Sequence, residues 1–114
     1  MEAKVKGRIW IELEGEKYMG KGHLQLLYAI QETGSLNGAA KKTGISYRKA
    51  WRLIHQINEM GREDVVLLKK GGAKGGGTKV TAYGMQLLEF YAGLQKEFSD
   101  SMQDYLTKHA ELWT

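Results

Sequence analysis

The 114-residue sequence contains no cysteine and no proline, and each absence narrows the possibilities. Without cysteine the chain can form no disulfide, carry out no thiol chemistry and build no zinc site from Cys ligands, so we expect a cytoplasmic setting. Without proline, every turn has to depend on Gly, Asn or Ser.

Long apolar runs are also lacking. No stretch approaches the roughly 20 apolar residues that a membrane-spanning helix needs, so no membrane association is expected. The N-terminus carries Lys4, Lys6 and Arg8 and has no continuous apolar core, which argues against a signal peptide. With 42% hydrophobic residues, the chain suits a single domain with a core of its own.

Positive charge is concentrated in one part of the chain. The formal net charge is +4, but residues 35–82 hold 10 Lys or Arg against 3 Asp or Glu, a net of +7, and the remainder carries −3. Such a basic segment is typical of a nucleic-acid-binding unit. The alternative is a generally basic protein with solvated lysines.

Residues 35–60 have the pattern of a helix-turn-helix. Ser35 can cap a short helix over 36–43, and Gly44 follows where a tight turn needs φ > 0. Ser46 can cap a third helix over 47–60. The small residues Ala40 and Ala50 would let the two helices approach closely. Apolar residues at i, i+3, i+4 and i+7 predict the inner face of the third helix: Ala50, Leu53, Ile54 and Ile57.

The flanking segments predict a mainly α fold with a small β-hairpin, of α+β class. Alternation over 5–13 predicts a strand within an N-terminal segment 1–20, with a turn over 14–17. An apolar stretch over 24–31 predicts a first helix that stops at Gly34. Leu24, Leu27 and Tyr28 share one face and Leu26 and Ile30 lie on a neighbouring one, so the helix is expected to be buried on two sides. Strand-like runs at 65–70 and 78–81 around the glycine-rich loop 71–77 predict a wing over 65–81. Thr81 can cap a long helix over 82–112, so 1–114 would form one winged helix-turn-helix domain.

The third helix is the expected DNA reader. The N-terminal half of such a helix enters the major groove, where Arg48 and Arg52 can bond guanine O6 and N7. Trp51 is expected to pack in the core or against another helix, with contact to DNA as the less favoured alternative. Three neighbours are expected to contact phosphates: Ser46, Tyr47 and Lys49. Four wing lysines are expected to reach the flanking backbone or a minor groove: Lys69, Lys70, Lys74 and Lys79. For any one of these residues the alternative is a solvated charge, and for the wing a loop without function.

Patterns of catalysis and metal binding are lacking. The loop GGAKGGG does not end in the Lys–hydroxyl pair of a phosphate-binding loop, and no helix follows it directly. The three histidines, His23, His55 and His109, are far apart and lack metal-ligand spacing. No Ser/His/Asp group or carboxylate pair stands out, so the sequence predicts neither an enzyme nor a metal site.

The long last helix carries an apolar repeat that favours a homodimer. Its first half is expected to join the domain core and its second half to contact a second subunit. Trp10, on the polar face of the N-terminal strand, is expected to take part. The predicted interface is Trp10, Tyr91, Phe98, Tyr105 and Leu112, the last four recurring every seven residues. The alternative is an ordinary amphipathic helix folded onto its own domain.

Two runs of the sequence carry a resemblance to a known family. GSLNGAAKKTGISYRKAWRLIHQINEM, followed by VVLLKKGGAKGGGTKVTAYGMQLLEFY, resembles the N-terminal domain of ModE-type, molybdate-responsive transcription regulators over roughly residues 20–94. The resemblance implies a LysR-like winged helix-turn-helix that dimerises, with the first strand and the last helix as natural contributors.

ModE-type proteins typically also carry C-terminal oxyanion-binding domains that sense molybdate. This sequence stops at Thr114, so no cofactor is expected. Two alternatives remain: a stand-alone regulator, or one that takes its signal from a separate effector-sensing partner.

Together these observations predict a homodimeric, sequence-specific regulator that binds double-stranded DNA. Two rivals stay open, and a third, an oxyanion-binding or phosphate-using enzyme, is strongly disfavoured. Of the two open rivals, one is a non-specific, architectural nucleic-acid binder, and the other is a winged-helix module that binds proteins.

Overall fold

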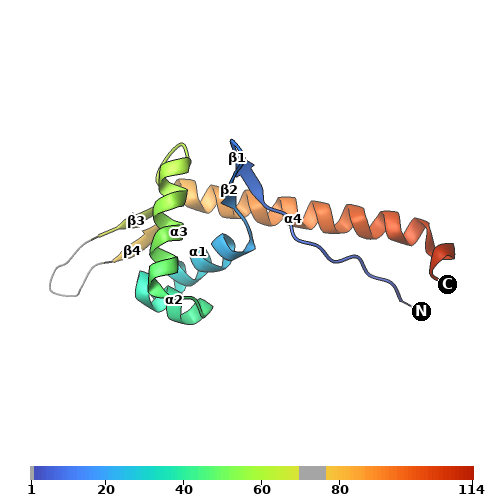
Figure 1. Cartoon of the computed structure of the whole chain (residues 1–114), viewed down its shortest axis with the longest axis horizontal. Coiled ribbons are helices and arrows are strands. Elements are labelled where there is room, and N and C mark those ends of the chain that lie inside the picture. The colour runs from blue at the N-terminus through green and yellow to red at the C-terminus, as the bar shows by residue number, and fades with distance from the viewer. Residues whose placement is uncertain (1, 70–76) are drawn as a thin grey trace.

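The chain is built mainly from helices, with two short β-hairpins between them (Figure 1). The computed structural model describes residues 2–69 and 77–114. The elements are β1 (Ile11–Leu13), β2 (Glu16–Met19), α1 (Lys21–Thr33), α2 (Leu36–Thr43), α3 (Tyr47–Met60), β3 (Val66–Leu68), β4 (Thr78–Val80), α4 (Ala82–Lys108) and a final 3-10 turn, η1 (Ala110–Leu112). This is the expected α+β winged-helix architecture.

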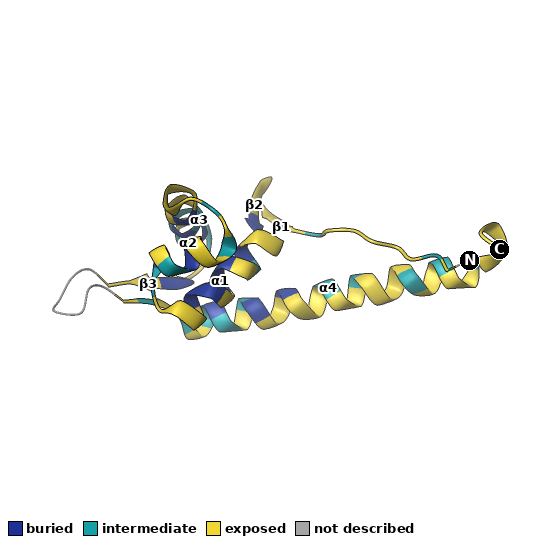
Figure 2. Ribbon diagram, turned by 90° about the horizontal axis from the view of Figure 1, so that it is seen from below, coloured by how far each residue is buried: buried dark blue, intermediate teal, exposed yellow. Residues whose placement is uncertain are grey.

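The molecule has a head and a projecting helix. Helices α1, α2 and α3 pack together with the hairpins, whereas α4 runs out of this group (Figures 1 and 2). The Cα radius of gyration is 17.5 Å, with a longest extent of 64 Å. A compact domain of this length would have a radius of about 13 Å, so much of α4 lies outside the head.

The bounds of α2 and α3 agree with the sequence prediction because their end signals are local. The Ser35 hydroxyl accepts a hydrogen bond from the Gly38 N–H at 2.9 Å, and the Ser46 hydroxyl accepts one from the Lys49 N–H at 3.0 Å. Gly34 ends α1 at φ 70° and Gly44 ends α2 at φ 74°, in the left-handed region that glycine tolerates.

Helix α1 begins three residues before the predicted start at 24. Its N-cap is Gly20, whose N–H donates to Nδ1 of His23 at 3.2 Å. The predicted shared face of this helix is wrong in one member, since Tyr28 is 44% exposed. The buried side chains are Leu27 of this face, Leu26 and Ile30 of the neighbouring face, and Ala29.

The predicted strand over 5–13 is wrong for most of its length. Only Ile11–Leu13 forms a strand, paired with β2 through a turn at residues 14 and 15. Residues 2–10 instead run beside α4 (Figure 2). Gln103 of α4 clamps this arm, because its Oε1 accepts from the Val5 N–H at 3.1 Å and its Nε2 donates to the Ala3 carbonyl at 3.2 Å. The alternation of apolar residues thus predicts extended backbone, but it does not predict the element against which that backbone packs.

The second hairpin is the predicted wing, with shorter strands than expected. Strands β3 and β4 pair antiparallel, with Val66 opposite Val80 and Leu68 opposite Thr78. The Thr78 N–H also donates to the Gly34 carbonyl at 2.9 Å, which ties the wing to the end of α1. Lys70 and Lys74, two of the predicted wing contacts, lie outside the described residues.

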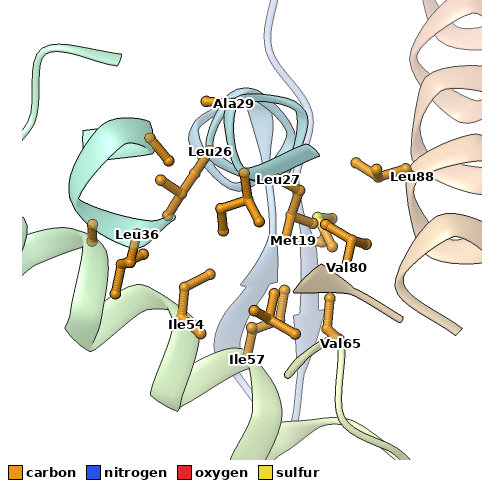
Figure 3. Close-up of a cluster of buried hydrophobic side chains, with 14 of the residues drawn as sticks. Met19, Leu26, Leu27, Ala29, Leu36, Ile54, Ile57, Val65, Val80 and Leu88 are labelled. Carbon is orange, nitrogen blue, oxygen red and sulfur yellow. The ribbon is translucent and has the colours of Figure 1, made fainter. Parts of the chain in front are cut away.

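One apolar core holds the head together. Side chains from β2, α1, α2, α3, the wing strands and α4 converge in it, as Figure 3 shows. The largest fully buried members are Tyr91, Met19, Leu26, Leu27, Ile30, Ile54, Ile57, Leu88, Val65 and Val66. Ala50, Ile54 and Ile57 are buried as the i, i+3, i+4 pattern predicted, while Leu53 is half-buried.

Helix α4 starts against the wing. The Thr81 hydroxyl accepts from the Gly84 N–H at 2.9 Å and donates to the Asp64 carbonyl at 2.7 Å. A Cβ on Gly84 would collide with the Val65 carbonyl oxygen and lie 2.7 Å from Cγ1 of Val80. The helix ends at Lys108 rather than near 112, and η1 completes the predicted segment.

The burial of His23 is testable, because protonation of its imidazole at acid pH should destabilise the folded protein. Burial, and secondarily the charge of Lys17, lowers the pKa of His23 to about 4. Between pH 6.5 and 4 the unfolded chain therefore binds a proton that the folded chain does not. The free energy of unfolding should fall by up to about 3 kcal/mol as the pH drops through this window.

Urea unfolding at a series of pH values measures this slope. His23→Gln is the matched control, because Gln retains an acceptor for the Gly20 N–H but does not titrate. The free energies of unfolding of the wild type and His23→Gln should depend differently on pH only below about pH 6.5. Parallel curves would contradict the assignment to His23.

Candidate nucleic-acid interface

Helix α3 has one buried and one exposed face. Ala50, Ile54 and Ile57 point into the core, whereas Arg48 and Arg52 lie on the opposite side and are exposed. Ser46, Tyr47 and Lys49 are exposed at the start of the helix. All five predicted contact residues of α3 therefore lie on its accessible N-terminal half. No Asp or Glu occurs from residue 46 to residue 58, so Arg48, Lys49 and Arg52 have no acidic neighbour within this stretch.

The turn before α3 allows α2 and α3 to approach closely. Ala39, Ala40 and Ala50 are all at most 2% exposed. The Ile45 N–H donates to the Ala40 carbonyl at 3.1 Å across the left-handed Gly44, and Ile45 packs against the core. The predicted role of these small residues in a tight helix-turn-helix is confirmed.

Asn58 joins α3 to the wing. Its Oδ1 accepts hydrogen bonds from the Val65 and Val66 N–H groups at 2.8 and 3.1 Å, and its Nδ2 donates to the Val66 carbonyl at 2.9 Å. These bonds fix β3 relative to α3. The sequence analysis missed this residue. An amide side chain in the last turn of a helix, a few residues before a strand, is the signal that could have indicated it.

The wing adds further positive charge beside α3. Lys69 follows β3, Lys79 lies within β4, and both are exposed. The Lys69 N–H donates to the Gly77 carbonyl at 2.8 Å, which extends the hairpin pairing beyond β3. Within the described residues, the structure thus places two of the four predicted wing lysines on a hairpin anchored to α3.

Trp51 does not pack into the domain, contrary to expectation. Its side chain is 47% exposed and stacks on His55, with ring centroids 3.6 Å apart and an interplanar angle of 19°. The spacing of Tyr47, Trp51 and His55 at i, i+4 and i+8 could have revealed this aromatic column from sequence.

The predicted dimer residues separate into two groups. Tyr91 is 1% exposed and its hydroxyl donates to the Ile9 carbonyl at 2.8 Å, so it belongs to the core of its own chain. Phe98 is half-buried near Gly7 of the N-terminal arm. Trp10, Tyr105 and Leu112 are 52, 68 and 68% exposed. Phe90, which the sequence analysis did not select, is also 59% exposed.

The described residues offer little for other chemistry. Within ranges 2–69 and 77–114, no group of three or more His, Asp or Glu residues is arranged to hold a metal ion. Among the helices described, none is long and apolar enough to cross a membrane.

The tight turn before α3, the exposed N-terminal half of that helix and the anchored hairpin define a winged helix-turn-helix, a class of DNA-binding domain.

No protein-family model matches the chain. It is 38% identical over 79 residues to "Molybdenum transport protein ModE" of Azotobacter vinelandii, covering 69% of this chain and 29% of that protein. It is 35% identical over 97 residues to "Transcriptional regulator ModE" of Yersinia pestis, covering 82% and 37%. It is 32% identical over 97 residues to the "DNA-binding transcriptional dual regulator ModE" of Escherichia coli, covering 82% of this chain and 37% of that protein.

The chain therefore belongs to the ModE family, and it corresponds to the N-terminal part of the ModE proteins. It spans about a third of the length of the relatives it matches.

The Asn58 anchor is testable by substitution. Asn58→Ala removes three hydrogen bonds to a buried stretch of backbone, so the free energy of unfolding should fall by about 2 kcal/mol or more. Urea denaturation measures the change. Gln56→Ala, on the other flank of the same helix, is the matched control and should change stability by less than about 0.5 kcal/mol. Equal effects of the two substitutions would contradict the anchoring role.

Proposed function

We propose that this chain is a homodimeric transcription regulator that reads duplex DNA by sequence. Helix α3 lies in the major groove and the wing contacts the flanking backbone. Arg48 and Arg52 contact base edges, and Ser46, Tyr47 and Lys49 contact phosphates. The observation that carries the proposal is the exposed, carboxylate-free N-terminal half of α3 held beside a basic hairpin. The names of the relatives, which include transcriptional regulators, support it.

The charge distribution supports DNA rather than protein as the partner of this surface. Lysine and arginine neutralise phosphates and release condensed counterions, which supplies much of the affinity for DNA. The basic segment 35–82 contains both α3 and the wing. The α3 N-terminus adds N–H groups and a positive dipole end that favour a phosphate.

Selection of bound sequences from random DNA by the purified protein tests the proposal. A two-fold symmetric motif is expected, because two recognition helices related by a dyad read two half-sites. Equal affinity for every sequence, explained wholly by the salt dependence, would favour a non-specific architectural protein instead.

Arg48→Ala and Arg52→Ala test the base-reading role. Each should weaken binding to the selected site by about ten-fold or more, while binding to random DNA changes less. Lys79→Ala is the informative comparison. Loss of a phosphate contact should weaken binding to the selected site and to random DNA equally, and it should lower the slope of log affinity against log salt by about one. Fluorescence anisotropy over a salt series measures all three. If the double variant R48A/R52A binds the site like wild type, α3 does not read it.

The dimer is proposed to form along the projecting part of α4. Phe90, Leu94, Phe98, Met102 and Tyr105 follow one another at steps of four and three residues, which places them on one stripe of the helix. Four of these side chains are at least 38% exposed. A second copy would remove this apolar stripe from water, as stable oligomer interfaces do.

Tyr105→Glu tests this interface. A carboxylate placed in the stripe would lose its hydration on dimerisation. The dissociation constant of the dimer should therefore rise at least about ten-fold above that of the wild type. Sedimentation equilibrium measures the dissociation constant. Tyr28→Glu, a substitution of an exposed tyrosine on α1, should leave it unchanged. A wild-type protein that sediments as a monomer at every concentration would disprove the dimer and leave the DNA proposal standing.

A further inference from the structure

An aromatic column runs along the exposed side of the recognition helix. Tyr47 and Trp51 are 52% and 47% exposed, and His55 continues the column one turn further on. Large aromatic side chains on the surface of a small domain commonly mark a contact with a partner. The proposed function assigns Tyr47 to a phosphate but gives Trp51 and His55 no role.

His55 holds the Trp51 ring in place. The two rings are stacked at 3.6 Å, and Nδ1 of His55 lies 2.9 Å from the Trp51 carbonyl oxygen in a hydrogen bond. The histidine is therefore fixed to the helix backbone, and the indole rests against it. A side chain that is ordered before binding loses less conformational entropy when it meets a partner.

The column lies on the flank of α3 that faces the wing. Trp51 and Asn58 are seven residues apart and therefore share a face of the helix, and Asn58 bonds to β3. Arg48 and Arg52 lie on the neighbouring, outermost face. The indole thus stands between the proposed base-reading arginines and the wing, within a stretch of α3, residues 46–58, that holds no carboxylate.

We infer that Trp51 reads thymine, by placing its indole against the 5-methyl group of one thymine in each half-site. This rests on the proposed major-groove binding of α3. Thymine is the base that presents an apolar group in the major groove, and apolar side chains recognise that methyl by contact. The positive charge of Arg48, Lys49 and Arg52 around the indole suits DNA rather than an apolar protein surface. His55 is a positioning residue that keeps the indole in its reading orientation.

Replacement of thymine by uracil isolates this contact, because it removes the methyl group and leaves base pairing unchanged. The selected binding site is synthesised with each thymine replaced by uracil in turn, in both half-sites. For the wild type, one position should lose about four-fold in affinity when one half-site is changed and about fifteen-fold when both are, in keeping with the burial of one methyl group per half-site. Anisotropy titrations at fixed salt give the ratio of affinities for the thymine and uracil sites.

Variants of Trp51 and His55 then connect the methyl group to the residue. Trp51→Ala should bind both sites alike, with a ratio near one, while Trp51→Phe should retain a ratio above one. His55→Ala should lower the ratio, and His55→Phe, which keeps a ring for stacking, should restore it. Trp113→Ala is the matched control, because Trp113 is 46% exposed and lies at the far end of the chain, and it should keep the wild-type ratio. Measurement at lower salt keeps weakly binding variants within range.

The outcomes separate the two proposals. A wild-type ratio of one at every thymine, a site without thymine, or a Trp51→Ala ratio equal to that of wild type overturns the thymine contact, while specific DNA binding still stands. Failure of the wild type to select any sequence removes the proposed function and the thymine contact with it.

Discussion

The hydrogen bonds of the Asn58 side chain fix the position of the wing relative to α3, the proposed recognition helix. A helix in the major groove and a hairpin on the adjacent backbone can act together only if their separation is constant. The bonds from Asn58 to Val65 and Val66 set that separation at one end of β3. At the other side of the hairpin, the Thr81 N–H donates to the Val65 carbonyl at 2.9 Å, and α4 starts there. Consecutive elements from α3 to α4 are therefore joined through the backbone of Val65 and Val66.

The parts of the fold that were predictable from sequence are those with local causes. Helices α2 and α3 have their predicted bounds because hydroxyl caps and left-handed glycines act within a few residues. The start of α1 was missed because its cap is a glycine backbone bonded to a histidine ring, a less common signal than Ser or Asp. The N-terminal strand failed for another reason. Its alternation is real, but the partner of residues 2–10 is a helix about a hundred residues further along the chain.

In the candidate interface, too, the residues that were predictable from sequence are those whose placement has a local cause. The exposed positions of Arg48 and Arg52 follow directly from helical periodicity. Asn58 could not be assigned, because its partners lie on a strand whose placement depends on the whole head. Trp51 was misjudged because large apolar residues are usually buried, although its spacing from His55 already placed the two rings side by side on the helix. Tyr91 was misjudged in the opposite direction, since a heptad repeat does not distinguish an intrachain core from an interface.

The close packing of Gly84 has a consequence for the geometry of DNA recognition. Because the Val65 carbonyl and Val80 leave no room for a Cβ, the angle between α4 and the wing is set by steric contact. In a dimer joined along α4, that angle would determine the distance between the two recognition helices. A larger residue at this position would then alter the preferred number of base pairs between half-sites, while the bases read within each half-site stayed the same. Sequence preference and spacing preference would therefore depend on different residues of the same chain.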